Sequence, residues 1–170
     1  MKKEWVAVLS TSVSFLALAG ASVGLYYGTK PAPVTMELDE NVAEMFASES
    51  PKGTTALENL SSPLLEKGFE VSFQEKEKKA FYYALVSDDT DYGAVKFAVG
   101  IEEGTVKYYS YLSDNGADDL GASQVNGNKD LFVGYKLGGA DVMAGVTAEY
   151  TYTGMKTAVD AALKDAEGRK

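Results

Sequence analysis

The chain of 170 residues contains neither cysteine nor histidine. Without cysteine, the protein has no disulfide, no cysteine-ligated iron–sulfur cluster and no c-type haem attachment site. Without histidine, it has no Ser-His or Cys-His catalytic pair, and a zinc site would need an unusual shell of carboxylates and water. These absences exclude the commonest sites of nucleophilic and metal-dependent catalysis.

Basic residues are also few. Lysine and arginine number 16 against 25 aspartates and glutamates, which gives a formal net charge of −9. Nucleic-acid binding needs clustered basic side chains at the phosphates, so we expect no nucleic-acid partner. Apolar residues make up 45% of the chain, which excludes a disordered protein on composition. The length suits one modest domain with an appendage.

Charged residues are missing from one long stretch near the N-terminus, residues 5–28. As a helix this stretch would be about 36 Å long, and a hydrocarbon core is roughly 30 Å thick. Trp5 at one end and two tyrosines at the other suit the two membrane interfaces. Lys2 and Lys3 place the N-terminus in the cytoplasm by the positive-inside rule. We therefore expect a single-pass cell-membrane protein whose C-terminal domain is extracytoplasmic.

A cleaved signal peptide is the alternative interpretation of this segment. Ala19, Gly20 and Ala21 have the small-residue pattern of a cleavage site. The apolar run continues past them to Tyr27, however, which is longer than a typical signal-peptide core, and no lipobox cysteine follows. The sequence favours a retained anchor and leaves cleavage open.

The chain divides into three predicted regions. Residues 1–30 form the membrane anchor or signal segment, residues 31–68 a helical linker region, and residues 69–170 an α+β domain. In the linker, apolar spacing predicts a helix over 36–48, and Thr54 or Thr55 could cap a short helix that ends at residue 60. Residues 64–67, ended by Gly68, form a further short piece.

The third region is predicted to consist mostly of strands. Runs of strands with helices at both ends predict an α+β fold, namely an antiparallel sheet flanked by helices and preceded by one N-terminal transmembrane helix. Residues 129–134 are ambiguous between helix and strand. Alternating apolar residues predict strands over 69–73 and 105–112, and apolar, β-branched or aromatic runs predict strands over 80–87, 94–101 and 147–152. Turns are predicted at 88–93 and 102–104, and strong helix-forming residues predict a helix over 156–166.

Generic catalytic and metal motifs are absent from the sequence. The aspartates at 88, 89 and 91 lack EF-hand spacing and its closing glutamate, so a solvated turn is the better interpretation. No nucleophile–base pair is apparent, although a site built on serine and lysine or on aspartate stays open. We therefore assign no catalytic residue and no metal ligand.

Three motifs follow one another between residues 92 and 163. The hairpin YGAVKFAVGIEEGTVKYYSYLSDNG comes first, and Leu120-Gly121-Ala122 comes second. DVMAGVT, residues 141–147, then precedes the final helix. In this order the chain resembles the FMN-binding domain of the G subunit of Rnf electron-transport complexes, a domain shared with the C subunit of sodium-pumping NADH:quinone reductase.

The resemblance implies a covalent flavin. In those relatives a separate flavin transferase attaches FMN to the motif threonine through a phosphodiester bond. By this register Thr147 carries the flavin, and Asp141 belongs to the motif that the transferase recognises. Gly145 also matches, whereas Ala144 stands where serine or threonine is usual and Val146 where alanine is usual. Leu120, Gly121 and Ala122 would line the flavin.

A second register competes with the first. Aligning the final helix without a gap puts Glu149 at the flavin position, and a glutamate cannot form the phosphodiester. The first register needs about two extra residues between the motif and the helix. Under the second register the protein would lack covalent flavin.

The resemblance therefore implies an electron carrier rather than a free-standing enzyme. FMN would supply the redox chemistry, and the protein would attach and position it. The implied partners are the membrane, a flavin transferase and other electron-transport proteins. The alternative is a non-redox, surface-anchored binding or structural module with a degenerate FMN-binding fold, which the departures at Ala144, Val146 and Glu149 favour.

Overall fold

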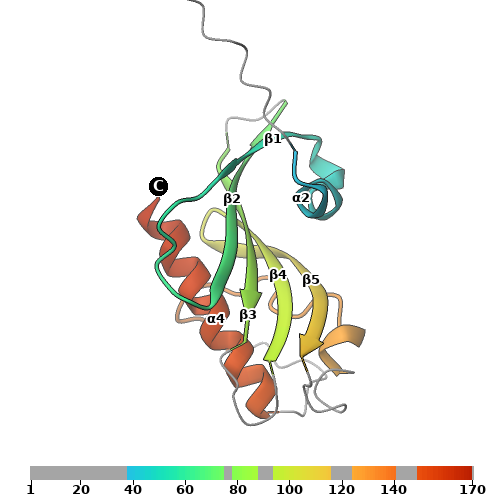
Figure 1. The fold of residues 1–170 in the computed structure, drawn as a ribbon, viewed down its shortest axis with the longest axis vertical. Coiled ribbons are helices and arrows are strands. Elements are labelled where there is room, and N and C mark those ends of the chain that lie inside the picture. Colours follow the sequence, from blue (N-terminus) through green and yellow to red (C-terminus); the bar gives the residue numbers. More distant parts are fainter. Residues whose placement is uncertain (1–37, 75–77, 88–93, 116–123, 141–148, 170) are drawn as a thin grey trace, which may run out of the picture. The chain divides into compact units, whose positions relative to one another are not determined.

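The computed structural model describes residues 38–74, 78–87, 94–115, 124–140 and 149–169 (Figure 1). The predicted anchor, residues 5–28, lies outside these ranges, as does the predicted turn at 88–93. Within the described ranges, no helix combines the length and the apolar character needed to cross a membrane.

Five antiparallel strands form one sheet, and each strand pairs with the next along the chain. The order across the sheet is therefore β1-β2-β3-β4-β5, and the α+β prediction with an antiparallel sheet is confirmed. The strands are β1 (Pro51–Ala56), β2 (Leu65–Phe73), β3 (Ala80–Val86), β4 (Ala94–Glu102) and β5 (Thr105–Asn115).

Both faces of the sheet are buried at its centre. Side chains of a strand alternate between faces, and β3 is apolar at every position from Ala80 to Val86. Tyr83 and Leu85 point to one core cluster, whereas Tyr82 and Ala84 belong to the other. Helices at both faces therefore complete two separate cores.

The larger core lies beneath the helix α4 (Glu149–Gly168), which crosses one face of the sheet (Figure 1). Met155, Val159 and Leu163 recur at helical spacing, are fully buried and belong to this core. The apolar residues of KTAVDAALKDA therefore recur at the spacing of a helix and form its buried face. The helix predicted over 156–166 is confirmed and begins earlier.

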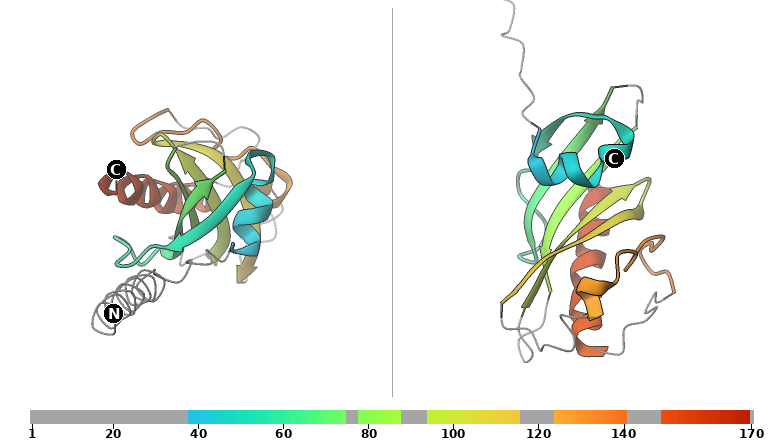
Figure 2. Two further views of the ribbon diagram at one scale, coloured as in Figure 1. Left: turned by 90° about the horizontal axis from the view of Figure 1, so that it is seen from above. Right: turned by 90° about the vertical axis from the view of Figure 1, so that its right-hand side faces the viewer.

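The smaller core lies beneath the short helix α2 (Glu40–Met45), which is followed by a 3-10 turn, Ala47–Glu49. Figure 2 shows α2 and α4 on opposite sides of the sheet. Asp39 caps α2, because its carboxylate accepts a hydrogen bond from the Asn41 backbone N–H at 3.0 Å. Val42 and Phe46 then insert into the core with no exposed surface.

Gly100 in β4 permits this close approach of α2. A Cβ at this position would lie 2.9 Å from the Phe46 ring and 2.9 Å from the Tyr108 ring, closer than atoms can pack. The absence of a side chain at Gly100 therefore lets Phe46 lie directly on the sheet.

The region predicted as a helical linker contributes two strands. The predicted helix over 54–60 is wrong, because residues 51–56 form β1 and pair with β2. The predicted break at Gly68 is also wrong, because β2 runs through it. A Cβ at Gly68 would lie about 3 Å from Leu57, Leu60 and Tyr83, so this glycine serves close packing rather than chain termination.

Two further predictions need correction near the C-terminus. The predicted strand over 147–152 is wrong where it is described, since α4 begins at Glu149. Aromatic and β-branched residues here form a helix because Tyr152 packs inward on its first turns. Residues 129–134 are turns, neither helix nor strand. The hairpin at 102–104 is confirmed, with Glu103 and Gly104 both at positive φ, 51° and 74°.

Candidate functional site

All eight residues assigned to the flavin lie outside the described residues. They fall into two short segments, residues 116–123 and 141–148. The first segment contains Leu120, Gly121 and Ala122. The second contains Asp141, Ala144, Gly145, Val146 and Thr147. Glu149, the flavin position of the competing register, is the first residue of α4.

The described elements that adjoin these two segments contribute rings to one aromatic cluster, to which β4 adds Phe97. Phe132 lies at its centre, and its ring centroid is 5.2 Å from Tyr152 in a stacked arrangement. The centroids of the other three rings lie 6.3–6.4 Å from Phe132. We call this set the aromatic cluster, and its members are Phe97, Tyr109, Phe132, Tyr135 and Tyr152.

The cluster holds residues 124–140 against the open edge of β5. Val106 donates its backbone N–H to the Tyr135 carbonyl at 2.9 Å, and Gly134 donates to the Val106 carbonyl at 2.8 Å. The Tyr109 hydroxyl donates to the Val125 carbonyl at 3.1 Å, and burial raises the pKa of Tyr109. Phe132 has a φ of 64°, a left-handed conformation that packing must maintain.

Polar groups connect the cluster to α4. The Tyr135 hydroxyl donates to Asp160 at 2.8 Å, and Lys156 forms an ion pair with the same carboxylate at 3.1 Å. The Lys156 ammonium also lies 5.3 Å from the Tyr135 ring centroid. Interactions with Tyr135 first and Asp160 second raise the pKa of Lys156. Lys156 therefore stays protonated beside Tyr135 and Asp160.

Thr147 lies outside the described residues, and only its neighbours along the chain bear on a fit to FMN. Thr147 precedes the first residue of α4 by two positions, and a helix N-terminus stabilises phosphate through its unpaired N–H groups. The rings of Phe132 and Tyr152 are buried in the core, so neither offers a free face for an isoalloxazine to stack on. Among the described residues, no group of three or more acidic side chains could hold a metal ion.

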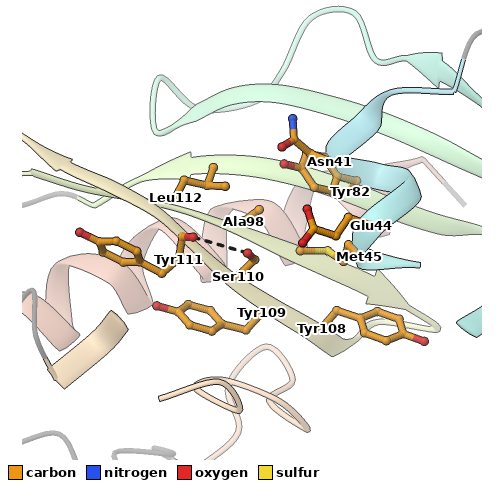
Figure 3. A pocket seen from close by; sticks show the side chains of 10 residues that line it. All are labelled: Asn41, Glu44, Met45, Tyr82, Ala98, Tyr108, Tyr109, Ser110, Tyr111 and Leu112. Carbon is orange, nitrogen blue, oxygen red and sulfur yellow. Dashed lines mark hydrogen bonds between the residues drawn. The ribbon is translucent and has the colours of Figure 1, made fainter. Parts of the chain in front are cut away.

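A groove lies on the opposite face of the sheet, between α2 and β5 (Figure 3). Its volume is about 400 Å³, within the range of small-molecule and side-chain pockets. We call it the α2 groove, and it is lined by Asn41, Glu44 and Met45 of α2, Tyr82 of β3, Ala98 of β4 and residues 108–112 of β5.

A network of charges fixes the C-terminal end of α2 next to this groove. Lys78 forms ion pairs with Glu49 and, at 2.7 Å, with Glu102. The Tyr108 hydroxyl donates to Glu49 at 2.5 Å. Lys78, and after it Tyr108, lower the pKa of Glu49 to about 2, against the opposing effect of burial. The network joins the 3-10 turn to β4, to β5 and to Lys78, which precedes β3.

We expect this network to make stability depend on pH in the acid range. The pKa of Glu49 is lower in the folded chain than its usual 4.5, so its stabilising contribution is present above pH 4.5 and lost as pH falls toward 2. The loss should be about 2 kcal/mol in the free energy of unfolding. Urea titrations at stepped pH measure it.

The matched variants for this measurement are Glu49→Gln and Glu103→Gln. Glu103 is exposed in the hairpin turn, so its variant should keep the full acid-range loss of the native chain. Glu49→Gln should show a visibly shallower loss between pH 4.5 and 2, because the titrating group is gone. An unchanged slope in Glu49→Gln would show that the pH dependence originates elsewhere.

Comparisons with known protein families, with curated proteins and with solved structures give no match for this chain.

Sequence reasoning missed both the α2 groove and the charge network. Their residues are scattered, since Glu49 and Lys78 meet Glu102 only after the sheet forms. One signal was available, because Tyr82 is a polar-tipped residue within the apolar strand β3. When its strand is buried, a tyrosine hydroxyl requires a hydrogen-bond partner or an opening to solvent.

Proposed function

We propose that this protein is a membrane-anchored, extracytoplasmic flavoprotein that relays electrons. FMN is carried covalently on Thr147 and supplies the redox chemistry when bound. The protein acts within a membrane electron-transport complex or in extracellular electron transfer, as a carrier rather than a free-standing enzyme. Residues 5–28 are the transmembrane helix, and the domain that follows is similar in motif order to the FMN-binding domains of the Rnf G subunit type.

The observation that carries the proposal is the arrangement around the aromatic cluster. One motif segment lies between β5 and residue 124, and the other lies between residue 140 and α4. Tyr109 of β5, Phe132 of the intervening stretch and Tyr152 of α4 all belong to this cluster. Motifs that are 20 residues apart in sequence are therefore flanked by residues that meet at one place.

The remaining roles follow from the motif. The Thr147 oxygen bonds to the FMN phosphorus, so the chain gains the mass of one FMN less one water. Asp141, Ala144, Gly145 and Val146 complete the segment that the flavin transferase recognises. Small residues there let backbone N–H groups approach the phosphate. Leu120, Gly121 and Ala122 line the flavin.

We expect covalent FMN on the full-length chain when it is produced together with a flavin transferase. Intact mass followed by peptide mapping should find the FMN-sized gain on Thr147, and Thr147→Ala should abolish it. Thr153→Ala removes an exposed threonine hydroxyl from α4 and should keep the full gain. Covalent flavin that persists in Thr147→Ala would refute the attachment site. A bare native chain under these conditions would refute the flavoprotein proposal.

The alternative function is a non-redox, surface-anchored binding module. Two observations favour it: the motif departs from the family pattern at Ala144 and Val146, and the α2 groove lies on the face opposite α4. A colourless protein without flavin that binds a ligand in this groove would select the alternative.

A further inference from the structure

The α2 groove contains a buried hydroxyl that none of the described residues pairs. Tyr82 is only 2% exposed and lines the groove from β3. Within the described part of the chain, its hydroxyl makes no hydrogen bond. Burying a hydroxyl without a partner costs roughly 1–3 kcal/mol. A polar group kept at that cost, at the wall of a groove, indicates a ligand that supplies the missing bond.

The polar groups around Tyr82 select the charge of that ligand. Glu44 and Asn41 of α2 line the groove beside it (Figure 3). The negative charge of Asp39 acts on Tyr82 as well and, together with burial, raises its pKa to about 12. Every one of these groups offers an oxygen that accepts hydrogen bonds. A donor with a positive charge is the complement.

The protein's own basic side chains do not supply this positively charged donor. Among the residues that the structure describes, no lysine or arginine lines the groove. Lys96 lies two residues before Ala98 in β4, and it forms an ion pair with Glu66 at 2.5 Å. The chain as a whole carries a net charge of −9, which attracts basic partners.

The apolar part of the lining selects the shape of the ligand. Met45 and Ala98 border the polar groups, and Leu112, which is 41% exposed, continues the apolar surface toward the end of β5. A chain of methylenes can lie on this surface while its charged end reaches Tyr82 and Glu44. The groove is open to solvent, so a free amine would bury little of its surface. A side chain presented by a protein gains contacts outside the groove as well.

We propose that the α2 groove binds a lysine side chain from a basic segment of a partner protein. The ammonium donates to Tyr82 and to the Glu44 carboxylate, and its methylenes pack on Met45, Ala98 and Leu112. This site does not involve the flavin motif, and of the five rings in the aromatic cluster Tyr109 alone also lines the groove.

The test is fluorescence anisotropy of the full-length protein in non-ionic detergent with a fluorescein-labelled peptide of alternating lysine and glycine. Glu44→Gln should weaken binding about fivefold, and Tyr82→Phe about threefold, because each removes one acceptor for the ammonium. Glu103→Gln removes the same charge from an exposed turn and should change binding by less than about twofold. A peptide with acetylated lysines should not bind.

A second measurement separates a binding role of Tyr82 from a structural one. Because its hydroxyl has no partner among the described residues, Tyr82→Phe should leave the melting temperature unchanged or raise it. A lower melting temperature would show that the hydroxyl has a partner within the protein and would overturn the proposal. Equal effects of Glu44→Gln and Glu103→Gln would show that binding depends on net charge alone, and they would also overturn the proposal. Displacement of the peptide by free butylamine at equal concentration would make this a small-molecule site and overturn the assignment to a protein partner.

Discussion

Replacing Phe132 by alanine is expected to lower the free energy of unfolding by about 3–5 kcal/mol. The Phe132 side chain is fully buried and contacts four other rings, two of them in β4 and β5 and one in α4. Its removal leaves a cavity where three parts of the chain meet, and the surrounding rings cannot close it without moving the sheet or the helix. Urea denaturation followed by tyrosine fluorescence measures the loss.

The backbone of Phe132 provides an unusual control. With φ at 64°, this position favours glycine over any residue that has a Cβ. Phe132→Gly should therefore be more stable than Phe132→Ala by about 1 kcal/mol, the reverse of the order at an ordinary position. Val133→Ala, at a neighbouring residue that is 37% exposed, should change stability by less than about 0.5 kcal/mol. If Phe132→Ala cost no more than Val133→Ala, the aromatic cluster would not hold this end of the domain together.

The strands that sequence alone predicted are those with local signals. β3 is a continuous apolar run, and β4 and β5 are joined by a turn that ends in Gly104, a residue suited to positive φ. These signals are contained within a few neighbouring residues, so they can be read without knowledge of the fold. The final helix was predicted for the same reason, because Met155, Val159 and Leu163 repeat at helical spacing.

The elements that sequence missed depend on distant partners. β1 contains a proline, a lysine and a glycine, and only its pairing with β2 makes it a strand. Gly68 suggested a chain break, but three side chains from other segments occupy the space that a Cβ would take. Tyr152 belongs to a helix because it stacks on Phe132. In each case a tertiary contact overrides local propensity.

The two candidate sites differ in the same way, because only one of them depends on neighbouring residues alone. The flavin motif can be read from a short segment ending at Thr147, which is why sequence yields a residue-level hypothesis there. The α2 groove combines Asn41, Tyr82 and Ser110 from three separate elements. No local pattern connects them, and the unpaired state of the Tyr82 hydroxyl becomes visible only once its surroundings are known.

Replacing Asp165 by alanine is expected to cost about 3–5 kcal/mol of unfolding free energy. Its side chain is 4% exposed and is held by two partners from distant segments and by Arg169, four residues further along the chain. It accepts hydrogen bonds from the Tyr83 hydroxyl at 2.8 Å, from the Ser61 backbone N–H at 3.0 Å and from Arg169 Nε at 2.6 Å. Burial raises the pKa of Asp165, but these donors outweigh burial and lower it overall. The variant leaves three donors unpaired at once.

The size of this loss depends on which hydrogen-bond donors lose their acceptor, and the contribution of Tyr83 can be measured. Tyr83→Phe in the native chain removes a satisfied hydroxyl and should be destabilising. In the Asp165→Ala background the same change removes a buried hydroxyl that has lost its acceptor, so it should recover about 1 kcal/mol. Glu167→Gln, at an exposed position of the same helix, should have almost no effect. Equal costs of Tyr83→Phe in both backgrounds would show that Tyr83 and Asp165 are not coupled. A coupled pair would instead establish Asp165 as the group that fastens the C-terminal end of α4 to the sheet, while the aromatic cluster fastens its N-terminal end.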